Sequence, residues 1–136
     1  NVILNVSASR RFGSQIFTAS NVFSVGVGIP RSLAMFRQPE LCFGGASCQI
    51  QPQVQLLDGG ENAISLDFVT VYSFAESLSP FRNEALWPSK IWSGRSDSMG
   101  IVTFTNIAID ISGLYVITFY GDKLHNISSN AFQVYV

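Results

Sequence analysis

The residues best suited to chemistry in this 136-residue sequence are its two cysteines. Cys42 and Cys48 enclose the segment Phe-Gly-Gly-Ala-Ser, a spacing that can close a small ring. A metal or redox pair is the alternative, but the spacing is not that of a CxxC motif, and no histidine or second cysteine pair is available to complete a zinc site. We therefore predict a Cys42–Cys48 disulfide, which implies an oxidising compartment and contributes about 2 kcal/mol in the chain-entropy model.

The rest of the sequence contains no recognisable catalytic constellation. The single histidine, His125, is interpreted as an exposed loop residue, without a second histidine or a free cysteine to form a nucleophile–base pair. Neither the hydrolase pattern G-x-S-x-G nor a phosphate-binding glycine loop occurs. We expect a protein that is not an enzyme, with no catalytic residue and no cofactor.

A pair of carboxylates could still catalyse glycoside cleavage, and a group of them could bind calcium. The candidates are scattered and lie mostly at predicted turns: Asp58, Glu61, Asp67, Asp110 and Asp122. Short side chains at turns commonly hydrogen-bond to the nearby backbone. This turn role explains the presence of Asp58 and Asp110 more simply than catalysis or calcium binding does. We predict no metal site within the chain and retain calcium between successive domains as an alternative.

Two N-glycosylation sequons are present, Asn5-Val6-Ser7 and Asn126-Ile127-Ser128. A three-residue pattern also arises by chance, but the pair agrees with the cysteines. We predict N-linked glycans on Asn5 and Asn126 and an extracellular or cell-surface localisation.

The composition excludes several classes of partner. Hydrophobic residues make up 47% of the chain, charged residues only 12%, and the formal net charge is −1. Such a chain has no long-range field that would gather nucleic acid or anionic lipid, and Arg10, Arg11, Arg31 and Arg37 form no basic stripe. No apolar run approaches the roughly 18 residues of a membrane span. We expect neither nucleic acid as a partner nor a membrane span.

Short alternating or β-branched runs, bounded by Gly, Pro, Asn and Asp, recur along the chain and predict an all-β fold. The expected strands cover residues 2–7, 16–27, 33–36, 50–57, 66–74, 101–109, 114–120 and 131–136.

An internal repeat gives the organisation of the chain. Residues 20–27 and 129–136 share the pattern Ser-Asn-x-Phe-x-Val-x-Val, and Val2, Leu4 and Val6 can be laid on Tyr115, Ile117 and Phe119. Residues 1–28 are therefore interpreted as the last hairpin of a preceding repeat, and residues 30–136 as a complete domain. An isolated hairpin is marginally stable, so it joins a preceding domain of a tandem array, completes a neighbouring subunit by strand donation, or folds back onto its own sheet.

One stretch carries a family resemblance. The segment Asp110-Ile111-Ser112-Gly113-Leu114-Tyr115 resembles the tyrosine corner of immunoglobulin-like domains, where a Tyr hydrogen-bonds back to an earlier backbone group. Ile117 stands where antibody domains carry their second core Cys, so the antibody-type inter-sheet disulfide is absent. The chain is similar instead to the E-set relatives of the fold, namely filamin-like, bacterial Ig-like and fibrocystin-type extracellular tandem domains.

Further stretches carry the same resemblance over most of residues 30–136. Residues 33–39, the pair Gly44-Gly45 and residues 51–58 are similar to the opening of surface-array Ig-like repeats, and residues 100–107 to their fifth strand. The resemblance implies an immunoglobulin-like antiparallel β-sandwich, an architecture that hosts many unrelated functions.

Residues 75–93 form an insertion where simpler repeats have a shorter connection. It contains Phe81, Trp87 and Trp92, and Trp is enriched at binding hot spots. The insertion is either a binding loop or inter-subunit contact, or an edge strand whose aromatic residues cap the sandwich core, and the sequence leaves both open.

The expected function is a structural repeat unit of an extracellular glycoprotein stalk, fibre or filament, whose partners are neighbouring copies of the domain. The alternative is an adhesion module that binds a protein or glycan ligand through the insertion.

Overall fold

The computed structural model describes residues 5–9, 15–19, 28–78 and 90–136, which form eleven strands and no helix. The all-β prediction is therefore confirmed. The strands are β1 (Asn5–Ser9), β2 (Gln15–Ala19), β3 (Ser32–Arg37), β4 (Cys42–Phe43), β5 (Gln53–Leu57), β6 (Thr70–Ser77), β7 (Trp92–Arg95), β8 (Ile101–Thr103), β9 (Gly113–Tyr120), β10 (Ile127–Ser128) and β11 (Phe132–Tyr135).

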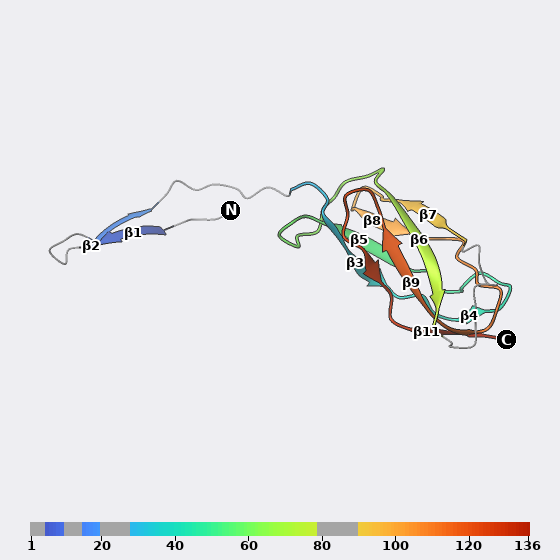
Figure 1. Cartoon of the computed structure of the whole chain (residues 1–136). Helices are drawn as coiled ribbons and strands as arrows, with labels where there is room; N and C mark the ends of the chain where they lie inside the picture. Colours follow the sequence, from blue (N-terminus) through green and yellow to red (C-terminus); the bar gives the residue numbers. More distant parts are fainter. Residues whose placement is uncertain (1–4, 10–14, 20–27, 79–89) are drawn as a thin grey trace.

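Strands β3 to β11 form an immunoglobulin-like β-sandwich, as predicted (Figure 1). One sheet has the order β3-β5-β8, and the other has the order β4-β11-β9-β6-β7, with β10 also pairing with β9. The strand pairs are antiparallel except that β4 runs parallel to β11. This exception arises because the chain leaves the first sheet after β3 and enters the second at β4.

Side chains alternate between the two faces of each strand, and the inward set forms the core. In β9, for example, Tyr115, Ile117 and Phe119 are buried, and Phe119 packs on Phe104 with ring centroids 5.2 Å apart. Full burial of such a side chain stabilises the fold by about 1.5–3 kcal/mol. The remaining large members of the core come from both sheets and from the loops beside them: Leu33, Val54, Leu56, Ile64, Val71, Trp92, Val102, Ile107, Ile109 and Val134.

The turn before β8 requires a glycine. Asp97 Oδ1 accepts hydrogen bonds from the N–H groups of Met99 (2.8 Å) and Ile101 (3.1 Å), which closes the turn. Gly100 has a φ of 75°, and a Cβ at this position would lie 1.6 Å from the carbonyl oxygen of Ile64. Only glycine fits both the conformation and the space.

Strand boundaries differ from the predicted ones for local reasons. The strand expected from residue 66 begins at Thr70, because Phe68 has a φ of 65° and breaks the extended run. The strand expected over 101–109 ends at Thr103, since Ile107 bonds instead to the loop before β5. Strands β4 and β10 were not predicted, because each has only two residues. Strand β7 lies at the edge of the larger sheet, as the edge-strand alternative for the insertion expects.

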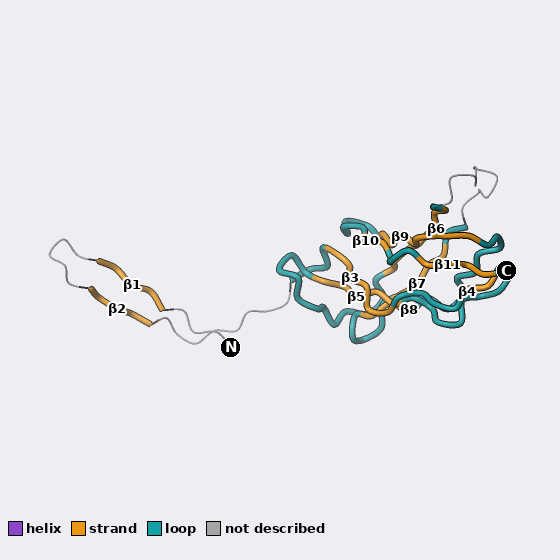
Figure 2. Tube along the Cα trace, turned by 90° about the horizontal axis from the view of Figure 1, so that it is seen from below, coloured by secondary structure: helices purple, strands orange, loops and turns teal. Residues whose placement is uncertain are grey.

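Strands β1 and β2 form a hairpin of their own. Their five residue pairs run from Asn5↔Ala19 to Ser9↔Gln15, and neither strand joins another strand within the described residues (Figures 1 and 2). The predicted strands at residues 2–7 and 16–27 fall partly outside the described residues, and the first copy of the repeat at residues 20–27 lies wholly outside them.

Candidate functional site

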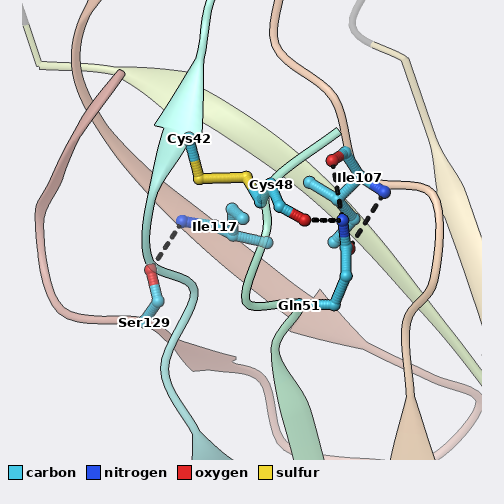
Figure 3. The surroundings of a disulfide bond; sticks show 6 residues. All are labelled: Cys42, Cys48, Gln51, Ile107, Ile117 and Ser129. Atoms are coloured by element: carbon cyan, nitrogen blue, oxygen red, sulfur yellow. Dashed lines mark hydrogen bonds between the residues drawn. A yellow bond between two sulfur atoms is a disulfide. The ribbon is translucent and has the colours of Figure 1, made fainter. Parts of the chain in front are cut away.

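The two cysteines form the predicted disulfide. Cys42 and Cys48 are both buried, and the bond closes the loop between β4 and β5 (Figure 3). Cys42 pairs with Val134 of β11, while the N–H of Cys48 donates to the carbonyl of Ile107 at 3.0 Å. The bond thus holds one loop against two other segments, which is a structural role.

Gln51 ties the disulfide loop to the segment before β9. Its buried side-chain amide donates to the carbonyls of Cys48 (2.8 Å) and Ile107 (3.1 Å), and its Oε1 accepts the N–H of Ile107 (3.1 Å), as Figure 3 shows. A buried amide with both ends satisfied locks the two segments in one arrangement.

The geometry at the start of β9 is that of the predicted tyrosine corner. The buried Tyr115 donates its hydroxyl to the carbonyl of Ile111 at 2.9 Å. Gly113 has a φ of 147° and pairs with Val134, while Asp110 is exposed. The corner fixes how the chain enters β9.

Asp58 organises the turn after β5. Its Oδ1 accepts the backbone N–H groups of Gly60 and Asn62, both at 2.9 Å, and its Oδ2 accepts the N–H of Gly28 at 3.0 Å. The Asn62 side-chain amide adds contacts of 3.1 Å to both oxygens. The hydrogen bonds from the Gly28 and Asn62 backbones lower the pKa of Asp58 from 3.8 to about 2. The turn role predicted for Asp58 includes a contact, to Gly28, that sequence reasoning missed.

The other candidates for chemistry are dispersed. Among the described residues, no group of three or more His, Cys, Asp or Glu side chains could hold a metal ion. Glu61, Asp67 and Asp122 are exposed, and so is His125, whose backbone N–H donates to the carbonyl of Arg31 at 2.9 Å. In the described part of the chain, no helix is long and apolar enough to cross a membrane.

Trp92 is a core residue, and its interpretation as an exposed interface residue is wrong. It is only 4% exposed, lies in β7, and pairs with Ser73 of β6 on the inward face. Of the two roles left open for the aromatic residues of the insertion, core packing is correct for Trp92. Phe81 and Trp87 lie outside the described residues.

An aromatic cluster lies on the outward face of the larger sheet. Tyr72 of β6 stacks on Tyr120 of β9 with centroids 5.6 Å apart, and Phe74 meets Tyr120 at 5.8 Å. These residues alternate with the buried Val71, Ser73 and Phe119. Sequence reasoning assigned the segment to a strand but did not identify this face, although the alternation of residues 71–74 is its signal.

The two sequons lie in different sheets. Asn126 is exposed and directly precedes β10, where Ser128 Oγ and Thr118 Oγ1 lie 3.0 Å apart in a hydrogen bond. Asn5 begins β1. No protein-family model matches the chain, and no curated protein matches it. Functional inference therefore rests on the residues themselves.

Proposed function

We propose that this protein is a structural repeat unit of an extracellular glycoprotein stalk, fibre or filament. Its sandwich would adjoin neighbouring copies of the same domain, and the β1–β2 hairpin would complete the sheet of one such copy. The E-set relationship is part of this proposal, and the sandwich fold supports it.

The observation that carries the proposal is the register of the N-terminal hairpin. The internal repeat lays Val6 on Phe119 and residues 18 and 19 on Ile127 and Ser128. Under this alignment the pair Val6↔Thr18 becomes Phe119↔Ile127, and Asn5↔Ala19 becomes Thr118↔Ser128. Those are the two residue pairs that join β9 to β10. Two segments that share both a sequence pattern and a strand register support a common structural role.

The repeated residues have identifiable roles in the second copy. Ser129 Oγ accepts the N–H of Ile117 at 2.9 Å (Figure 3). It also donates to the carbonyl of Asn130 at 2.8 Å, which bridges the break between β10 and β11. Phe132 packs against the core, and Val134 is fully buried. The pattern therefore contains the residues that attach the last strand to a sandwich.

A hairpin of this kind needs a sheet. A two-stranded sheet is marginally stable in water, and β1 and β2 find no third strand within the described residues. In the second copy, β9 also pairs with β6, which gives the larger sheet its continuity. An equivalent of β6 from a preceding domain or another subunit would provide the same partner for β1.

The extracellular setting rests on covalent chemistry. Disulfides persist in oxidising compartments, and Cys42–Cys48 is formed. The exposed Asn126 is suitably placed for a glycan, because a bulky sugar needs a surface position.

Amide hydrogen exchange tests the proposal. In the isolated chain we expect the β1 and β2 amides to exchange nearly as fast as an unfolded peptide, while β9 amides are protected. In native assembled material, the hairpin amides should become as protected as those of β9. Strong hairpin protection in a dilute monomer would contradict the proposal. The intact mass of the native material distinguishes the two forms of assembly. A mass near 14.9 kDa plus glycan would favour strand donation between subunits, and a much larger mass would favour a tandem polypeptide.

The adhesion alternative keeps one supporting observation, the outward-facing aromatic cluster of Tyr72, Phe74 and Tyr120, in which Tyr72 is 40% exposed. The burial of Trp92 removes one of its expected contact residues.

A further inference from the structure

The Asn126 sequon adjoins the aromatic cluster through strand register. Strands β9 and β10 are antiparallel, with Ile127 opposite Phe119 and Ser128 opposite Thr118. The pairing ends at Ile127, and the chain on its other side reaches β3, where His125 pairs with Ser32. Asn126 directly precedes Ile127, whose partner Phe119 is the neighbour of Tyr120 in β9, and Tyr120 in turn pairs with Tyr72 of β6.

Side-chain alternation puts Asn126 on the aromatic side of the sheet. Ile127 packs against the core, and the hydroxyl of Ser128 bonds to Thr118 on the opposite face. The residue before Ile127 therefore faces outward, and Asn126 is indeed exposed. Asn126 therefore lies next to the outward row in which Tyr120 and Tyr72 pair.

The neighbouring pair on the same face, Phe74 and Thr118, is also suited to contact with a sugar. Phe74 lies opposite Thr118 and contacts the Tyr120 ring, while Tyr72 remains 40% exposed. An aromatic face of this kind offers an apolar surface with hydroxyl groups at its edge. A pyranose ring matches it, because one face of the sugar presents C–H groups and its rim presents hydroxyls.

We infer that an N-linked glycan on Asn126 folds back over Tyr120 and Tyr72 and covers the outward face of the larger sheet. The inference rests on the proposed extracellular function, because only a chain in the secretory pathway receives this glycan. The outward face is then occupied by a sugar tethered to the same chain and not by a second copy of the protein. The covalent attachment one strand away supplies a high local concentration of that occupant.

Tyrosine nitration followed by mass spectrometry tests the inference. The full chain is secreted from a eukaryotic host, and the folded glycoprotein is compared with the Asn126→Gln variant and with wild type from which an amidase has removed the glycan. Tyr135 is the internal control, because it is 52% exposed and its ring meets Phe43 at 5.8 Å, much as Tyr72 meets Tyr120. We expect the glycan to slow nitration of Tyr72 and Tyr120 several-fold and to leave Tyr135 unchanged.

Each other outcome overturns the inference in a distinguishable way. Equal nitration rates with Asn126 occupied would exclude glycan cover and leave the proposed function intact. Protection that persists in Asn126→Gln and grows with protein concentration would assign the face to a second copy. An unoccupied Asn126 beside an occupied Asn5 would defeat the inference alone. If a secreted chain carried glycan at neither asparagine, the glycoprotein part of the proposed function would fail with it.

Discussion

The N–H of Gly28 lies 3.0 Å from Oδ2 of Asp58, so the segment entering the sandwich is attached to the turn after β5. The same carboxylate closes its own turn through Gly60 and Asn62. Nearby, the N–H of Arg31 donates to the carbonyl of Leu57 at 2.8 Å. Gly28 and Arg31 are thus both held against the segment at the end of β5.

The acid sensitivity of the fold should depend on Asp58. Its pKa is lowered from 3.8 to about 2, so its contribution to stability is present above pH 3.8 and is lost as the pH falls toward 2. We expect wild type to be more stable than Asp58→Asn at neutral pH and the difference in Tm to shrink over that window. Thermal unfolding of both proteins at several pH values measures it. A difference in Tm that did not change with pH would contradict the assignment.

Two substitutions at Gly28 separate the hydrogen bond from packing. Gly28→Pro removes the donor, whereas Gly28→Ala keeps it and adds a Cβ at an ordinary contact distance of 3.5 Å from Asp58 Cβ. We expect Gly28→Pro to raise the pKa of Asp58 toward 3.8 and Gly28→Ala to leave it near 2. A carbon-detected NMR titration of the Asp58 carboxyl provides the measurement. Identical titration curves for the two variants would show that the Gly28 bond does not matter.

Gln51→Leu should destabilise the fold by about 3 kcal/mol, because the buried N–H of Ile107 loses its acceptor and two carbonyls lose a donor. The matched control is Gln53→Leu, which removes an exposed 2.8 Å bond to Thr103 and should cost less than about 0.5 kcal/mol. Urea unfolding of both variants gives the comparison. Equal losses would mean that Gln51 is not a structural bridge.

Trp92 and Ser73 form the most unusual buried pair. They are directly opposite in β7 and β6, and neither Trp92 Nε1 nor Ser73 Oγ has a hydrogen-bond partner among the residues that the structure describes. Ser73→Ala should therefore be neutral or stabilise by up to about 1 kcal/mol, whereas Trp92→Ala should destabilise by about 4 kcal/mol. Chemical denaturation distinguishes the two. If Trp92→Ala left stability unchanged, its assignment to the core would be wrong.

The contribution of the tyrosine corner to stability can be measured by removing one hydroxyl group. Tyr115→Phe removes the 2.9 Å bond to the carbonyl of Ile111 and should cost about 1 kcal/mol. Tyr135→Phe deletes a hydroxyl at an exposed position and should change the free energy of unfolding by less than about 0.5 kcal/mol. Equilibrium unfolding in urea compares them, and equal effects would show that the corner bond contributes nothing specific.

The sequence by itself determined the all-β class and the disulfide, because these follow from local signals, and the resemblance of residues 30–136 to immunoglobulin-like domains implied the sandwich. Alternating side chains fix a strand, and two cysteines separated by a short glycine-containing loop can meet without help from the rest of the chain. The repeat marked Ser129, Phe132 and Val134 as shared positions, and the structure gives each a contact with the sandwich.

Only the tertiary structure decided which aromatic residues are buried and what the turns hold. The residue type alone does not show whether a Trp is buried or faces solvent. The pairing of β7 with β6 places Trp92 in the sandwich core. Gly28 and Asp58 lie 30 residues apart, so their bond exists only once β3 and β5 have paired. The meeting of Tyr72 with Tyr120 likewise depends on a strand register that no local pattern specifies.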